Sequence, residues 1–177
     1  MIEAQVYGIG VDARWQRPVV LLRERTERHR LLPIWLAVSD ARAMGRAHRA
    51  EFGRRPDTHG LIVDLMQVVG RRLVRVGVTD LLDGVFHGEL LLDDGARVNA
   101  RATDALTLAL KAGVGIEVAA AVFDRAGVPD GGMVLIASHP AGTATEHVEG
   151  PQEETEQEIE RFRRFLDTTS PQDFQLD

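Results

Sequence analysis

Residues 73–101 read LVRVGVTDLLDGVFHGELLLDDGARVNAR, a stretch in which alternating apolar residues are interrupted twice by turn signals. Alternation with a period of two is typical of half-buried strands. Asp83-Gly84 is a strong signal for a tight hairpin turn, and Asp93-Asp94-Gly95 is a second turn signal. The stretch therefore predicts a three-stranded antiparallel meander, with strands at 73–80, 85–92 and 96–101.

Upstream of this meander, short runs rich in valine, isoleucine and leucine predict further strands. Pro33 lies inside one of these runs. Because proline cannot donate a hydrogen bond to a ladder, we expect that strand at an edge of the sheet or bent at this residue. The predicted strands cover residues 2–11, 19–22 and 31–38.

Helical spacing of apolar residues predicts helices around these strands. Ser39-Asp40 is expected to start the first, because serine caps free N–H groups and aspartate suits the positive end of a helix dipole. We expect this helix to reach about Phe52 and to stop at Gly53. The other predicted helices run from Asp57-Thr58 to Gly70, from a Thr103-Asp104 cap through 105–111 to Gly113, and, after a strand at 116–118, to about Arg125.

The C-terminal part of the chain differs in composition from the rest. Residues 129–151 are rich in glycine, proline and small residues, which predicts a flexible linker. Residues 152–177 are acidic, and Ile159, Phe162 and Leu166 fall on one face of a predicted helix. The expected organisation is an α+β domain at 1–128, in which helices pack on a mixed or antiparallel sheet, followed by the linker and an acidic helical tail.

Composition limits the classes of site. The chain has no cysteine, which excludes disulfides and thiolate metal sites. No apolar run approaches the roughly 18 residues that a membrane span needs, and no leader pattern is visible at the N-terminus, so we expect a soluble cytoplasmic protein without a membrane partner. Charge is uneven: residues 14–55 hold eleven arginines and four acidic residues, whereas 141–177 hold ten acidic residues and three arginines.

Several segments, in order, resemble the bifunctional nuclease domain family over roughly residues 2–128. They are Leu32-Pro33-Ile34-Trp35-Leu36, Asp40-Ala41, Arg55-Pro56-Asp57-Thr58-His59, Asp80-Leu81-Leu82-Asp83-Gly84-Val85-Phe86 and Arg101-Ala102-Thr103-Asp104-Ala105. The tail resembles that of actinobacterial members. The resemblance implies an α+β fold, self-association as a homo-oligomer, and DNase and RNase activity. The chain departs from the family pattern at Gly60 and Asn99, where acidic residues are usual, and at Ala102, where proline is usual.

Phosphodiester cleavage needs an activated water and neutralisation of the phosphate charge, and divalent metals held by carboxylates supply both. Asp80, Asp83 and Asp104 are the candidate ligands for Mg²⁺ or Mn²⁺, and Asp80 and Asp104 are also candidate catalytic residues. The alternative is that Asp83 serves only its hairpin turn and Asp104 only its helix start. No organic cofactor is expected, because no glycine-rich phosphate loop occurs.

Other residues are candidates for acid–base chemistry and substrate binding. His59 could act as a general base, because histidine titrates near neutral pH, or could simply bond a neighbouring group. Arg101 could clamp a phosphate, with an ion pair to Asp80 or Asp104 as the favoured alternative.

A row of arginines occurs on the first predicted helix. Arg42, Arg46 and Arg49 fall on one face, where they would follow a DNA or RNA backbone, form a solvated surface, or receive the acidic tail. Two functions stay open for the chain as a whole. One is a metal-dependent nuclease of weak activity, and the other is a non-catalytic oligomeric module for binding or regulation.

Overall fold

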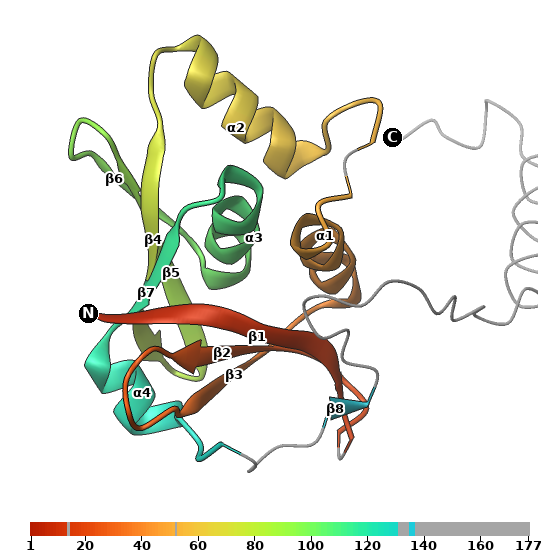
Figure 1. The fold of residues 1–177 in the computed structure, drawn as a ribbon, viewed down its shortest axis with the longest axis vertical. Coiled ribbons are helices and arrows are strands. Elements are labelled where there is room, and N and C mark those ends of the chain that lie inside the picture. Colours follow the sequence, from red (N-terminus) through yellow and green to blue (C-terminus); the bar gives the residue numbers. More distant parts are fainter. Residues whose placement is uncertain (14, 52, 131–134, 137–177) are drawn as a thin grey trace, which may run out of the picture. The chain divides into compact units, whose positions relative to one another are not determined.

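The computed structural model describes residues 1–13, 15–51, 53–130 and 135–136. The predicted acidic tail at 152–177 and most of the predicted linker lie outside these residues. Within them, the fold is α+β, as predicted from the sequence (Figure 1). The elements are β1 (Ile2–Asp12), β2 (Pro18–Glu24), β3 (Leu31–Trp35), α1 (Val38–His48), α2 (Thr58–Val68), β4 (Leu73–Leu82), β5 (Val85–Leu92), β6 (Arg97–Arg101), α3 (Ala102–Ala112), β7 (Gly115–Val118), α4 (Ala120–Ala126) and β8 (Leu135–Ile136).

One mixed sheet joins two antiparallel meanders. The strand order is β3-β2-β1-β7-β4-β5-β6, and β8 pairs with β1. The central strand β7 runs antiparallel to β1 and parallel to β4, so it connects the N-terminal meander to the one at 73–101. Strand β3 lies at an edge of this order, which confirms the position expected from Pro33.

The hairpin between β4 and β5 forms as the sequence predicted. Asp83 and Gly84 have φ angles of 48° and 79°, so both central residues are left-handed, as a type I′ turn requires. In the predicted linker, Leu135–Ile136 forms the short strand β8 and pairs with Val11 and Asp12 of β1. This segment therefore contributes backbone pairing to the sheet.

Three predicted helix caps or ends need correction. Helix α1 begins at Val38 without a side-chain cap, so Ser39 is not its cap. It ends at His48 rather than Phe52, because the Glu51 N–H bonds to the Arg46 carbonyl and the Ala50 N–H to the Ala47 carbonyl, which closes the helix in a Schellman motif. Ala50 takes the left-handed position of that motif, with a φ angle of 52°.

Helix α3 also starts earlier than predicted. It begins at Ala102, directly after β6, so Thr103 lies inside the helix and does not cap it. In α2 the cap is Asp57, whose carboxylate accepts a hydrogen bond from the Gly60 N–H at 2.9 Å. Threonine and aspartate can both cap, and the sequence alone did not show which of the neighbouring residues holds the non-helical position.

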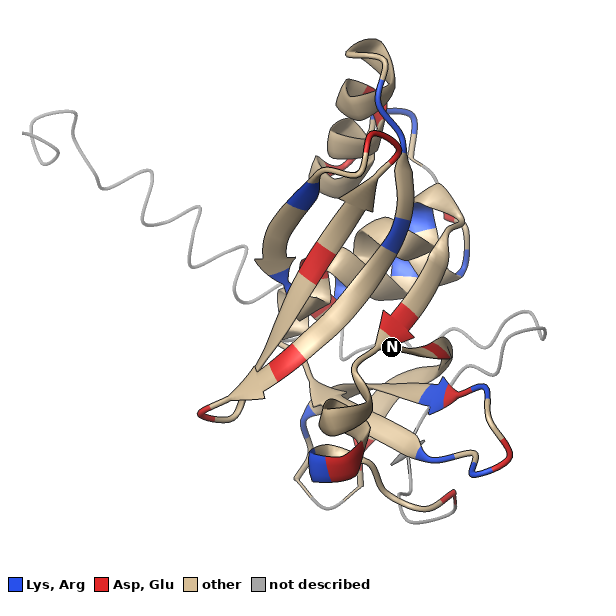
Figure 2. Ribbon diagram, turned by 90° about the vertical axis from the view of Figure 1, so that its left-hand side faces the viewer, with Lys and Arg blue, Asp and Glu red and all other residues tan. Residues whose placement is uncertain are grey.

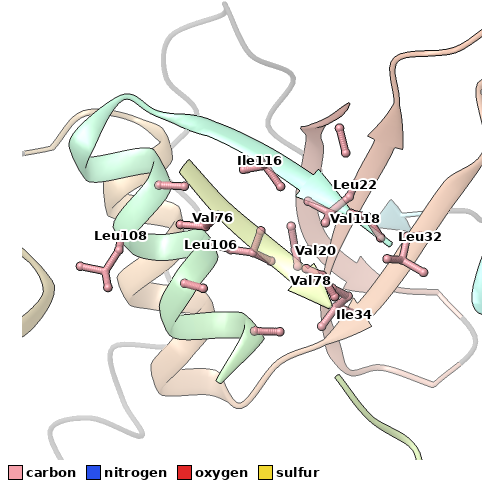
Figure 3. Packing of buried hydrophobic residues seen from close by; sticks show 14 of the residues in the cluster. Val20, Leu22, Leu32, Ile34, Val76, Val78, Leu106, Leu108, Ile116 and Val118 are labelled. Atoms are coloured by element: carbon pink, nitrogen blue, oxygen red, sulfur yellow. The ribbon is translucent and has the colours of Figure 1, made fainter. Parts of the chain in front are cut away.

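The core lies between α3 and the sheet. Buried side chains of β2, β3, β4 and β7 meet those of α3, including Val78, Leu106 and Val118, which are at most 1% exposed (Figure 3). Helices α1 and α2 flank α3 on the same side of the sheet (Figure 1), and α4 packs against β3 and β4. In contrast, α2 has no fully buried residue. Within the described ranges, no helix has the length and apolar character needed to cross a membrane.

Gly88 of β5 permits α3 to start close against the sheet. A Cβ atom at this position would lie 2.9 Å from the Ala102 Cα. We therefore expect Gly88→Ala to displace the first turn of α3 and to lower the free energy of unfolding by about 1–3 kcal/mol, measured by urea denaturation. Gly115→Ala is the matched control, because no atom of the described residues lies within 4 Å of its Cβ position. An equal loss in both variants would contradict the close approach at Gly88.

Candidate functional site

Four charged or titratable side chains from separate segments meet where β6 passes into α3. The Arg101 guanidinium forms a two-pronged pair with Asp104, with Nε 2.7 Å from Oδ2 and Nη2 2.8 Å from Oδ1. Nε2 of His59 lies 3.2 Å from Oδ1 of the same carboxylate. Nη1 of Arg101 also lies 3.5 Å from Oδ2 of Asp40. We refer to Asp40, His59, Arg101 and Asp104 as the helix-start cluster.

Each member of the cluster is placed by the start of a helix. Asp40, His59 and Asp104 all lie in the first turn of their helices, α1, α2 and α3 respectively. Arg101 is the last residue of β6 and stands at the N-cap position of α3. The positive ends of helix dipoles favour nearby carboxylates. Because α1 and α2 both pack on α3, three sequence-distant first turns come together.

The cluster is open to solvent on the arginine side. The Arg101 side chain is 65% exposed, whereas His59 is 17% exposed and Asp104 32%. Hydrogen bonds from Arg101 hold the pKa of Asp104 below its usual value, against the opposing effect of burial, and His59 lowers it further. Asp104 in turn raises the pKa of Arg101, with a smaller contribution from Asp40. Around neutral pH the cluster therefore presents an ionised carboxylate held by a cation.

The lowered pKa of Asp104 implies a pH-dependent contribution to stability. Its carboxylate stabilises the folded state fully above the unfolded pKa, about 3.9, and this contribution is lost as the pH falls through the lower folded pKa. The difference in unfolding free energy between wild type and Asp104→Asn is thus expected to shrink as the pH falls below about 4. Urea titrations at each pH measure it, with Asp64→Asn at an exposed carboxylate of α2 as control. A difference that grows below about pH 4 would contradict the assignment.

A second polar group adjoins the cluster. Lys111, whose side chain is only 6% exposed, lies 3.1 Å from Asp57, the cap of α2. Arg46 approaches the same carboxylate at 3.7 Å. Burial raises the pKa of Asp57, but the hydrogen bonds from the Gly60 N–H and from Lys111 outweigh it, so the pKa lies below its usual value. This group fixes the start of α2 and with it the position of His59.

The structure does not bring the three predicted metal ligands together. Oδ1 of Asp80 lies 3.6 Å from Nη1 of Arg125 in α4 and accepts the Leu81 N–H. Asp83 occupies the hairpin turn, and Asp104 belongs to the helix-start cluster. Across the part of the chain that the structure describes, no group of three or more histidine, aspartate or glutamate side chains is placed to hold a metal ion.

The predicted arginine row on α1 is exposed. Arg42, Arg46 and Arg49 all face solvent. Arg49 forms a two-pronged pair with Glu51, at 2.6 and 3.2 Å. Through the contact of Arg46 with Asp57, the row reaches the beginning of α2. Figure 2 shows basic and acidic residues interspersed along the chain rather than separated into blocks.

Sequence reasoning assigned no site role to Asp40 or Lys111. The sequence predicts Asp40 only as an acidic residue at a helix start. Its position in the Asp40-Ala41 segment of the family pattern is the signal that could have identified it as a site residue. Lys111 is the only lysine of the chain and stands between Leu110 and Ala112. A lone lysine in an apolar stretch signals a specific partner, because a buried ammonium group requires one.

Comparison with known proteins agrees with the resemblance described above. The family model of the bifunctional nuclease domain matches residues 20–131, a range that contains the whole helix-start cluster. The uncharacterized protein Rv1829 of Mycobacterium tuberculosis strain H37Rv and the uncharacterized protein MT1877 of strain CDC 1551 are each 38% identical to this chain over 174 residues. The matches cover 98% of this chain and 98% of each relative. Both relatives are mycobacterial, as the actinobacterial resemblance of the tail predicted.

Proposed function

Because this chain belongs to the bifunctional nuclease domain family, we propose that it hydrolyses phosphodiester bonds of DNA or RNA at the helix-start cluster. The observation that carries the proposal is the arrangement of His59 and Arg101 on the two oxygens of Asp104. It combines a group that can accept a proton, a carboxylate that orients this group, and an exposed cation. All three lie within the range that the family model matches.

Arg101 is the proposed phosphate ligand. Its guanidinium is planar and carries several N–H donors that match the geometry of phosphate oxygens. Its bonds to Asp104 fix the side chain, while 65% of its surface stays accessible. The distance of 3.5 Å between Nη1 of Arg101 and Oδ2 of Asp40 is long for a hydrogen bond. Nη1 can therefore exchange this weak contact for a hydrogen bond to a phosphate oxygen at little cost in free energy.

His59 is the proposed general base. With Nε2–H donated to Asp104, the imidazole keeps its lone pair on Nδ1, where it can accept a proton from an attacking water. The water oxygen forms a bond to phosphorus as the ester P–O bond breaks. The proton moves to Nδ1, and the imidazolium returns it to the departing oxygen. Asp104 stabilises the imidazolium without itself becoming protonated, since its pKa is lowered.

A divalent metal stays part of the proposal as a cofactor to be tested. The three aspartates predicted as ligands do not fit a shared ion, because Asp80 pairs with Arg125 and Asp104 with Arg101. Asp40 and Asp104 are the carboxylates that would hold a metal ion in the cluster, where it would supply positive charge to the phosphate, but both contact the Arg101 guanidinium. The proposed reaction therefore uses the side chains of His59, Arg101 and Asp104 alone.

The arginine row of α1 is the proposed extension of the nucleic-acid surface. Arg42 and Arg46 lie on the exposed side of α1, whose first turn supplies Asp40, and Arg49 follows as the exposed C-cap residue of that helix. Phosphate contacts of this kind release counterions, so affinity should fall steeply with salt. A triple Arg42/Arg46/Arg49→Ala variant with an unchanged salt slope would remove this row from the proposal.

The decisive experiment incubates the purified chain with single-stranded DNA and RNA in Mg²⁺, Mn²⁺ or EDTA. Cleavage that is lost in an Arg101→Ala variant supports the proposed site. Cleavage in EDTA as fast as in Mg²⁺ would assign the reaction to the side chains alone, and cleavage restricted to Mg²⁺ or Mn²⁺ would add the metal. Absence of cleavage in all three conditions would reject the nuclease proposal and favour the alternative, a non-catalytic module for binding or regulation.

The surface of α2 favours a second proposal, self-association. Helix α2 exposes an apolar stripe on one side, in which Leu61 and Leu65 are each 57% exposed and Val68 83%. Ile62 and Val69 widen it. The spacing of 61, 65 and 68 is that of a helix–helix seam, and an uncharged seam can pair with its own copy about a twofold axis. We propose that two copies of this chain pack through the α2 stripe.

Leu65→Glu is expected to dissociate this dimer, weakening it by about 100-fold or more, because the new charge would be buried without a partner. Light scattering after size-exclusion chromatography measures the mass directly. Gln67→Glu adds the same charge on the other side of α2 and serves as the matched control. A wild-type chain that stays monomeric at the highest concentration reached would reject the proposal, as would a Leu65→Glu chain that stays dimeric.

A further inference from the structure

A shallow groove lies beside the helix-start cluster on the last two strands of the sheet. It has a volume of about 330 Å³ and is lined by Val85, Phe86, His87, Asn99, Ala100 and Arg101. Arg101 thus belongs both to the groove and to the proposed catalytic cluster. Strand β6 is the outermost strand of the sheet, so the groove lies at a sheet edge.

The lining of the groove combines apolar surface with hydrogen-bonding groups. Val85, Phe86 and Ala100 supply the apolar part, of which Phe86 and Ala100 also pack against the core, and His87 and Asn99 supply side chains that donate and accept hydrogen bonds. His87 pairs in register with Arg101 across β5 and β6, so the two side chains leave these strands on the same face of the sheet. A nucleobase has the same two properties, an apolar face for stacking and a polar edge for hydrogen bonds.

The charge of the groove also suits a nucleotide. None of its six lining residues is acidic, and Arg101 is its formal cation. Glu89 lies directly opposite Asn99 across β5 and β6, and its carboxylate is paired with Arg97. Asn99 therefore offers a neutral amide next to a cation, and the amide of asparagine is a common partner for the edge of a base.

We infer that this groove binds a nucleobase adjacent to the phosphate held by Arg101, and that the chain consequently prefers single-stranded nucleic acid. The inference rests on the proposed function and adds a subsite to it. In a duplex, each base is stacked and paired and its face is closed to a protein surface, whereas a base in a single strand can turn out and stack on a side chain. The groove thus selects the substrate class through Val85, His87 and Asn99, which share one face of β5 and β6, and Arg101 holds the backbone.

Fluorescence anisotropy with a labelled deoxythymidine pentamer tests the inference, over a time in which gels show the pentamer intact. An abasic pentamer of equal charge is expected to bind about tenfold more weakly, the loss typical of one stacked base. His87→Ala and Asn99→Asp should remove most of this difference, and melting curves should show that both remain folded. Gln5→Glu makes the same amide-to-carboxylate change at an exposed position of β1 and should keep the difference.

The outcomes separate the subsite from the chemistry. Base-dependent binding that is lost in Asn99→Asp supports the groove even if no cleavage is found, in which case only the nuclease proposal fails. Equal binding of the abasic and the deoxythymidine pentamer overturns the inference, and so does a base preference that survives in both groove variants. Tighter binding of a short duplex than of the single strand overturns it as well.

Discussion

Replacing His59 with alanine is expected to slow nucleic-acid cleavage by about 10²–10⁴-fold, the usual contribution of a positioned general base. The ring is 17% exposed and is held by Asp104 at 3.2 Å, so alanine removes the proton acceptor and leaves the ion pair of Arg101 with Asp104 in place. Asp104→Asn should also lower the rate, because an amide neither orients nor stabilises the imidazolium as a carboxylate does. Rates are measured on the single-stranded substrate that the wild type cleaves fastest.

Two controls make this result specific. His29→Asn changes an exposed histidine whose φ angle is 50°, a conformation that asparagine tolerates, and should leave the rate unchanged. The pH profile of the rate supplies the second control, since loss of a general base removes the acidic limb of the curve rather than scaling the whole curve. Cleavage that continues at the same rate in His59→Ala and Asp104→Asn would point to another site or to a contaminating enzyme.

The sequence predicted the strands well because their signals are local. Alternation around residues 73–101 and the Asp83-Gly84 dipeptide specify a hairpin within a few residues of chain, and the structure confirms both. Helix ends were harder to predict. The end of α1 depends on carbonyls of Arg46 and Ala47 that close on the next residues, with alanine rather than glycine in the left-handed position.

The candidate site shows where sequence patterns stop being informative. The order of family segments selected His59, Arg101 and Asp104, and the structure joins them by hydrogen bonds. The same reasoning selected Asp80, which instead lies 3.6 Å from Arg125 of α4. The position of Asp80 at a strand end before a turn predicts that this acid is near the surface. Which helix it contacts depends on the path that the chain takes after the meander. That path runs through β7 and α4, whose packing no local signal reveals.

A buried ion pair, also unseen from the sequence, sets the second large expected effect. Glu24 is only 1% exposed. Its carboxylate accepts hydrogen bonds from Nε and Nη2 of Arg30, both at 3.0 Å, and from the Arg30 N–H at 3.2 Å. Arg30 also bonds Asp124 at 2.8 Å and lies over the ring of Phe123, with 5.2 Å to its centroid. This pair therefore ties the β2–β3 turn to α4.

Glu24→Ala is expected to lower the free energy of unfolding by about 3–5 kcal/mol, because it leaves the largely buried guanidinium of Arg30 without its main partner. Hydrogen bonds from Arg30 hold the pKa of Glu24 below its usual value, so this stabilisation is present above the unfolded pKa and is lost as the pH falls through the folded one. Urea denaturation at neutral pH measures the effect. Glu27→Ala, an exposed acid of the same turn, should change stability by no more than about 0.5 kcal/mol. If the two variants lose the same stability, the pair contributes no more than an ordinary surface charge. A loss confined to Glu24→Ala would show that the buried carboxylate holds Arg30 in the position from which it contacts Asp124 and Phe123 of α4.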